Sequence, residues 1–202
     1  YFTKGAMTLG TLVTTVIATP LSYLVSPLGM VVIIIVFCLS WFFGIHGGSV
    51  VFTAIMPLYI AAYATNAELA VAGKELVFNP IFLYGAVSIL GGSGNTLPLC
   101  VMGLKSKSKQ ISAVSKAALV PGLFNINEPA IFGFPIMYNP ILLIPFTLNS
   151  LVVMGFMYVA YKFGLMCLPQ VLIMTTLPVG IQSLMSTLDW RNVVFALLMF
   201  PV

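Results

Sequence analysis

Charge is scarce in this sequence. Only 6% of its 202 residues are charged, whereas a soluble globular domain carries about 25%. Hydrophobic residues make up 60% of the chain, and the mean hydropathy is +1.13. Because so few polar side chains cannot cover a water-exposed surface, the composition excludes a soluble protein with a buried core. It predicts an integral membrane protein.

Cysteine is scarce as well, and the sequence lacks recognisable clusters of catalytic or metal-binding residues. Cys38, Cys100 and Cys167 lie in separate apolar stretches without the spacing of a metal or redox site, so we interpret them as small core residues. No metal-ligand cluster, carboxylate pair or Ser-His-Asp order is evident. We therefore predict no metal and no cofactor, and a protein that binds and carries its ligand rather than a complete catalyst.

The few basic residues are concentrated in one place. Four of the eight lie in a short polar connection: Lys105, Lys107, Lys109 and Lys116. In a membrane protein such a cluster indicates a cytoplasmic loop, so the net charge of +4 is no sign of a nucleic-acid partner. The chain starts at Tyr1, without a charged leader before its first apolar run, and we interpret it as a fragment of a longer protein.

The apolar runs differ in length. Leu28–Gly44 is the clearest predicted span, and Ile141–Tyr161 is a second of full length, because roughly 20 residues cross a bilayer. Thr11–Val25 is predicted as a broken helix or as an element packed on protein. Ser49–Ala64 is predicted as a short apolar segment.

The other segments are polar or interrupted. Asn66–Lys74 and Lys105–Lys116 are predicted as loops. Pro80–Leu90 and Thr96–Leu104 flank the glycines of Gly91–Gly94, which indicates a re-entrant or broken segment. Prolines interrupt two later runs, residues 121–140 and 165–185.

Glu128 is the only formal charge between Pro121 and Tyr161. A carboxylate at membrane depth costs roughly 2.5 to 3.5 kcal/mol on insertion scales, so it needs a partner or a purpose. Asn127 precedes it and Pro129 follows it, and a residue before proline is pushed away from helical angles. We therefore predict that Glu128 lies on non-helical backbone that faces a polar ligand pocket.

Two further polar islands interrupt the hydrophobic background. The only histidine, His46, lies between a long apolar run and Gly47-Gly48, where small residues let a ligand approach the backbone. Gly91–Thr96 lacks the Gly-Lys-Ser/Thr ending of a nucleotide loop. The alternative interpretations are that His46 has a purely structural role and that Gly91–Thr96 is a turn without a ligand. Carboxylate, amide and imidazole groups together suit sugar hydroxyls, and Trp41 could stack on a sugar face or serve packing alone.

Several stretches together resemble one family: Trp41–Gly47, Gly91–Gly94, Phe124–Ile136, Asn139–Leu142, Ile144–Phe146 and Asp189–Arg191. The resemblance is to the membrane component, enzyme IIC, of sugar phosphotransferase systems of the lactose/cellobiose/chitobiose type. It runs in the family's order from about Pro20 to Arg191. The chain departs from the family pattern at Asn95, at Pro98 and over Phe134–Tyr138.

The resemblance implies an all-α membrane protein with multiple transmembrane helices, re-entrant hairpins and broken helices. It places residues 1–202 in the C-terminal, substrate-binding half of enzyme IIC, with Thr11–Val25 as a connecting or interface helix and the N-terminal half absent. It also implies a multi-pass protein of the bacterial cytoplasmic (inner) membrane. The full-length family forms homodimers surrounded by membrane lipid.

A sugar site is implied too. In the family, the residues matching His46 and Glu128 hydrogen-bond the sugar, and Glu128 and Asn127 lie near the hydroxyl that becomes phosphorylated. The phosphorylated cysteine and histidine belong to separate IIB and IIA components. The predicted substrate-binding residues are Trp41, His46, Gly47, Gly92, Ser93, Gly94, Asn95, Asn127 and Glu128.

These patterns lead to one predicted function and two rivals. The predicted function is a phosphotransferase permease that binds and translocates a disaccharide resembling cellobiose, chitobiose or lactose and presents its 6-hydroxyl to phospho-IIB. Glu128 is the candidate that orients this hydroxyl and acts as its general base. The main alternative is a proton-coupled sugar transporter in which Glu128 and His46 relay protons. A structural membrane scaffold is the third hypothesis.

Overall fold

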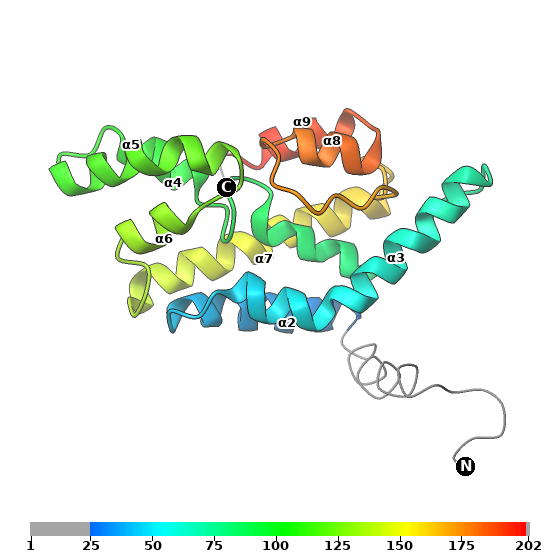
Figure 1. Ribbon diagram of the computed structural model, residues 1–202, viewed down its shortest axis with the longest axis horizontal. Helices are drawn as coiled ribbons and strands as arrows, with labels where there is room; N and C mark the ends of the chain where they lie inside the picture. Colours follow the sequence, from blue (N-terminus) through cyan, green and yellow to red (C-terminus); the bar gives the residue numbers. More distant parts are fainter. Residues whose placement is uncertain (1–24, 201–202) are drawn as a thin grey trace, which may run out of the picture.

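The computed structural model describes residues 25–200, and every regular element in that range is a helix. The elements are α2 (Pro27–Phe42), the π-helix η1 (Gly48–Phe52), α3 (Thr53–Val71), the 3₁₀-helix η2 (Pro80–Ser88), α4 (Leu97–Gly103), α5 (Lys109–Leu123), α6 (Glu128–Gly133), α7 (Pro140–Lys162), α8 (Ile181–Thr187) and α9 (Arg191–Leu198). The prediction of an all-α protein is confirmed (Figure 1). Most of the predicted segment Thr11–Val25 lies outside the described residues.

Within residues 25–200, two continuous helices are long and apolar enough to cross a membrane. One is Gly48–Val71, in which η1 runs directly into α3, and the other is α7. On α7, exposed apolar side chains recur every three or four residues: Ile141, Ile144, Leu148, Val152, Phe156 and Val159. This spacing gathers them along one face of the helix, as lipid contact requires. The predicted span Ile141–Tyr161 is therefore a helix of the expected length.

Helix α2 has only 16 residues and is shorter than the predicted span Leu28–Gly44. Its start is well defined, because the Ser26 side chain accepts a hydrogen bond from the Gly29 N–H and Pro27 occupies the first turn. The helix packs against α7 and η2. Its largest fully buried side chains are Met30, Ile34, Phe37 and Trp41.

Helix α3 corrects a predicted loop. We expected Asn66–Lys74 to be a loop, but the helix continues to Val71. The reason is that Asn66 is 1% exposed and makes tertiary hydrogen bonds. Its side-chain amide donates to the Pro169 carbonyl at 2.9 Å and accepts from the Val77 N–H at 3.0 Å. A polar residue that looked solvated thus joins three segments of the chain.

The glycine-rich segment forms the tip between η2 and α4, as predicted for two short apolar pieces. Gly91, Gly92 and Gly94 all have positive φ angles, between 73° and 81°. Asn95 holds the tip closed, because its side chain accepts from the Leu90 N–H at 3.0 Å and donates to the Ala86 carbonyl at 2.9 Å. The tip is therefore a rigid turn in the protein interior.

The basic segment is only partly a loop. Helix α5 begins at Lys109, so Lys109 and Lys116 are helical, and the connection after α4 holds Lys105 and Lys107. The start of the helix is capped by the Ser108 side chain, which accepts from the Ile111 N–H. The predicted loop Lys105–Lys116 is wrong in its second half for this reason.

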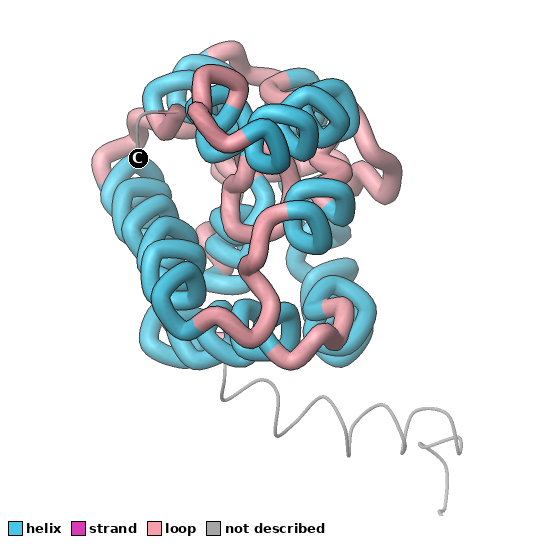
Figure 2. The backbone as a smooth tube through the Cα atoms, turned by 90° about the vertical axis from the view of Figure 1, so that its left-hand side faces the viewer, coloured by secondary structure: helices cyan, strands magenta, loops and turns pink. Residues whose placement is uncertain are grey.

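The segment after α7 is irregular over residues 163–180, and loops of this kind join the helices in Figure 2. Its prolines at 169 and 178 interrupt the apolar run, as predicted. The Val179 N–H donates to the Leu123 carbonyl at 2.8 Å. Asn192, which is 2% exposed, bonds both the N–H and the carbonyl of Cys167. These bonds fix α8 and α9 beside the cavity described next.

Candidate functional site

His46 and Glu128 are 82 residues apart in the sequence and lie side by side in the structure. His46 follows α2, and its Nε2 is 3.3 Å from Oε1 of Glu128. Both side chains are partly exposed, 46% for His46 and 42% for Glu128. The structure thus brings together the two residues that the sequence singled out from separate polar islands.

The backbone determines which nitrogen of His46 carries the proton. The Ser49 N–H donates to Nδ1 of His46 at 3.0 Å, so Nδ1 must be an unprotonated acceptor. The proton of the neutral ring therefore sits on Nε2 and is donated to Glu128. Ser49 belongs to the π-helix η1, a local geometry that frequently occurs at functional sites.

Glu128 is the first residue of α6, which corrects the prediction of non-helical backbone. Pro129 is tolerated in the first helical turn because its missing N–H would have no partner there. The two carboxylate oxygens of Glu128 differ. Oε1 faces His46, whereas Oε2 is shielded from solvent and has no hydrogen-bond partner among residues 25–200. A shielded, unpartnered acceptor of this kind is ready to accept a proton donor from a ligand.

The glycine-rich tip is tied to the segment that carries Glu128. The Asn127 side chain donates to the Ser93 carbonyl at 2.6 Å. Asn125 accepts from the N–H groups of Gly91 at 2.9 Å and Gly92 at 3.3 Å. The position of Glu128 therefore depends on the shape of the tip, since both asparagines bind its backbone.

A cavity of about 600 Å³ opens beside this pair, within the usual range for small-molecule sites. Five of the predicted residues line it: His46, Gly92, Ser93, Asn127 and Glu128. Aromatic side chains form part of its wall, and the rings of Phe52 and Tyr84 stack with their centroids 5.7 Å apart. The cavity therefore combines a polar region around Glu128 with flat apolar walls, a combination that suits a sugar ring.

The other four predicted residues do not line the cavity, and the structure gives them supporting positions instead. Trp41 is 1% exposed and lies behind His46, with ring centroids 4.5 Å apart. A Cβ on Gly47 would lie 2.6 Å from the Phe37 carbonyl oxygen, and a Cβ on Gly94 would collide with the Phe146 ring. Asn95 uses its side chain to close the glycine-rich tip.

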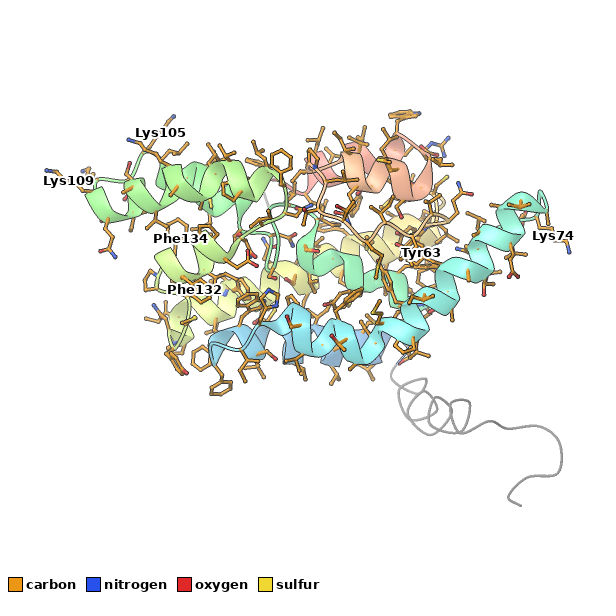
Figure 3. The ribbon with its side chains drawn as sticks, in the orientation of Figure 1. Tyr63, Lys74, Lys105, Lys109, Phe132 and Phe134 are labelled. Carbon is orange, nitrogen blue, oxygen red and sulfur yellow. The ribbon has the colours of Figure 1, made fainter. Side chains whose placement is uncertain are left out.

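Sequence reasoning missed several lining residues. Tyr59 and Tyr63 lie in an apolar helix, where their spacing of four places them on one face, and their hydroxyls are 3.1 Å apart. Tyr63 also contacts the Ser186 hydroxyl at 3.4 Å, and Figure 3 shows Tyr63 pointing toward the middle of the molecule. The spacing was a usable signal for the tyrosines. Ser49 gave none, because it acts mainly through its backbone.

Comparisons with known proteins agree with one another. The profile of the family described as "Phosphotransferase system, EIIC" matches residues 1–150. The chain is 41% identical to the lichenan permease IIC component of Bacillus subtilis (strain 168) over 162 residues, which are 78% of this chain and 36% of the relative. It is 35% identical to the lactose-specific EIICB component of Lacticaseibacillus casei over 170 residues, or 82% of this chain and 26% of the relative.

A solved structure is similar over nearly the whole chain. It is the crystal structure of the transporter ChbC, the IIC component from the N,N'-diacetylchitobiose-specific phosphotransferase system, with a TM-score of 0.85 and 30% identity. The match covers 96% of this chain and 46% of ChbC. The chain thus spans about a quarter to a third of the length of these curated relatives and about half that of the solved structure.

Proposed function

Since the chain belongs to the EIIC family of the phosphotransferase system, we propose that it forms the sugar-binding part of a permease. Its ligand is a disaccharide of the cellobiose, chitobiose or lactose type. The chain corresponds to the C-terminal, substrate-binding half of enzyme IIC, with Thr11–Val25 as the connecting or interface helix. The similarity to parts of longer relatives supports this assignment.

One observation carries the proposal. Glu128 keeps a shielded, unpartnered oxygen at the edge of a cavity while its other oxygen is held by the Nε2–H of His46. Sugar hydroxyls can donate to this oxygen and accept from nearby donors. The aromatic walls, which include Tyr59 and Tyr84, offer apolar surfaces for the ring faces of the sugar.

We propose that the bound sugar is phosphorylated at this site. The sugar 6-hydroxyl attacks the phosphorus of a phosphocysteine on IIB, the S–P bond breaks, and the thiolate stays on IIB. Glu128 orients the hydroxyl and takes its proton as the new O–P bond forms. None of the three cysteines of this chain suits the role of the phosphocysteine. Cys38 and Cys100 are buried, and the partly buried Cys167 donates a hydrogen bond from its thiol to the Asp189 carboxylate. The relative named as an EIICB component supports IIB as the partner, with IIA acting on IIB.

We also propose that the chain is part of a multi-pass protein of the bacterial inner membrane. The full-length protein would form a homodimer. The two spanning helices and their exposed apolar side chains support membrane insertion. The proton-coupled alternative has no support from the relatives, which carry phosphotransferase names. In addition, Nδ1 of His46 is already occupied by the Ser49 N–H, so a proton relay through the ring would first have to break that bond.

Tryptophan fluorescence offers a direct test of sugar binding. The chain has two tryptophans: Trp41, which contacts His46, and Trp190, which is 67% exposed. In a Trp190→Phe variant, Trp41 is the sole reporter. We expect cellobiose, N,N'-diacetylchitobiose or lactose to change its emission saturably, and mannitol to leave it unchanged.

The matched control is Trp41→Phe, in which only the exposed Trp190 remains. That variant should show no saturable change with any sugar. If none of the three disaccharides perturbs Trp41 in protein whose circular dichroism shows the expected helix content, the proposed sugar site is wrong.

A further inference from the structure

Four exposed lysines gather where α4 turns into α5. Lys105, Lys107, Lys109 and Lys116 form this group, which we call the lysine patch. No acidic residue occurs between Glu75 and Glu128, so none belongs to α4, α5 or their connection. Among the described residues, no carboxylate lies within ion-pair distance of a patch lysine. The patch is therefore a concentrated positive charge that no carboxylate among residues 25–200 pairs with.

Exposed apolar side chains accompany the patch. Met102, five residues before Lys107, is 75% exposed, and Val101 and Ile111 are 37% and 36% exposed. A loop that met only water or a soluble acidic partner would not need large apolar side chains beside its lysines. Lysines next to apolar groups are typical of segments at the boundary between lipid headgroups and acyl chains.

Aromatic residues mark the same end of the molecule. Figure 1 shows the α4–α5 turn, the end of α2 and the start of α7 at one end, and Figure 3 shows Lys105 and Lys109 opposite Lys74. Phe43, after α2, is 55% exposed, and Tyr138, before α7, is 66% exposed. The Tyr138 hydroxyl donates to the Phe43 carbonyl at 3.0 Å. Exposed aromatic residues of this kind are enriched where membrane meets water.

The distribution of basic residues assigns this end a side of the membrane. The lysine patch holds four of the chain's eight basic residues within twelve positions, whereas Lys74, at the opposite end in Figure 3, has no other basic residue within 25 positions of it. An excess of lysine marks the cytoplasmic side. The lysine patch therefore faces the cytoplasmic leaflet, whose anionic lipids attract basic segments next to the membrane.

We propose that the lysine patch is a binding site for anionic phospholipid headgroups of the cytoplasmic leaflet. The ammonium groups contact the headgroup phosphates, while Met102 and Val101 enter the outer acyl region. Bound lipid holds the α4–α5 hairpin against the membrane surface. The site is separate from the cavity, so it does not depend on the proposed sugar function.

Short-chain lipids test this site on the detergent-purified chain. Dioctanoyl phosphatidylglycerol is expected to raise the unfolding temperature, whereas dioctanoyl phosphatidylcholine and inorganic phosphate are not. Replacing all four patch lysines with glutamine should remove the effect, and each single replacement should weaken the apparent affinity roughly fivefold. The matched control is Lys74→Gln/Lys162→Gln, which removes the lysines of the opposite end and should behave like the parent.

Several outcomes would overturn the proposal. One is equal stabilisation of the parent and the four-lysine variant by phosphatidylglycerol, provided that both unfold at the same temperature without lipid. A second is equal stabilisation of the parent by phosphatidylcholine, or by phosphate alone. A third is tight binding of polyglutamate, as an acidic protein probe, without a preference for phosphatidylglycerol, because it would assign the patch to a soluble partner.

Discussion

A Glu128→Gln variant is expected to bind the disaccharide about 10- to 100-fold more weakly and to lose phosphoryl transfer. In the parent, Oε2 is a shielded acceptor without a protein partner, and a hydrogen bond to a charged group contributes roughly 1.5–3 kcal/mol. The glutamine amide presents a donor at one of the two oxygen positions, so a sugar hydroxyl there faces an N–H group. Loss of a general base costs a further factor of roughly 100 or more in the transfer step.

The Trp41 fluorescence titration measures the first effect, and transfer of labelled phosphate from phospho-IIB measures the second. Glu68→Gln is the matched control, because Glu68 is an exposed carboxylate on α3 away from the cavity lining. It should bind sugar like the parent. Parental affinity in a folded Glu128→Gln protein would show that the carboxylate does not contact the sugar.

A Gly92→Ala variant is expected to lose most sugar binding, by at least 10-fold, through displacement of the residue next to Glu128. Gly92 has a φ of +79°, and a Cβ there would lie 2.7 Å from Oδ1 of Asn127 and from the Asn125 carbonyl oxygen. Real Cβ atoms do not approach other atoms so closely. The Asn125–Asn127 segment or the tip must therefore shift, and we expect the hydrogen bond from Asn127 to the Ser93 carbonyl to be weakened.

The control for Gly92→Ala is Gly73→Ala. Gly73 also has a positive φ, +65°, but a Cβ there meets nothing within 4 Å. Both variants carry the backbone penalty of about 1–2 kcal/mol for a left-handed alanine, and only Gly92→Ala adds the collision. Unfolding temperature and the Trp41 titration should separate them. Unimpaired sugar binding in Gly92→Ala would mean that the tip does not position Glu128.

The sequence predicted the parts of the site that interrupt a uniform background. Glu128 and His46 stood out because charge and histidine are rare in this chain. Their contact could not be derived from spacing, because 82 residues separate them and the fold of α2, η1 and α6 brings them together. The proton position on His46 was equally inaccessible, since a backbone N–H determines it.

Secondary structure was predictable where local signals dominate. The apolar run of α7 has the length of a membrane span, and its helix follows that run. The prediction failed at Asn66, because a polar residue after an apolar run is typical of a loop. Its hydrogen-bond partners, Pro169 and Val77, lie outside α3 and could not be identified from the local sequence. The start of α5 was predictable from the sequence but was missed. Ser108, directly before Lys109, is a typical N-cap residue.

Supporting residues were harder to separate from ligand-contacting ones. Trp41 and Asn95 have the side-chain chemistry of a sugar site, but Trp41 packs behind His46 and Asn95 binds backbone groups of the tip. A single sequence does not distinguish a side chain that touches the ligand from one that holds its neighbour. The cavity also recruits α8 and α9 through Ser186 and Asn192, whose roles depend entirely on how the chain returns.

Nitrogen-15 NMR of the imidazole tests the central claim most directly, because His46 is the only histidine and its signals need no further assignment. We expect the proton of the neutral imidazole on Nε2, and a shift of both nitrogen signals when a disaccharide saturates the Trp41 response. A proton on Nδ1 instead, or signals that stay unchanged at saturating sugar, would contradict a site in which His46 and Glu128 receive the sugar together.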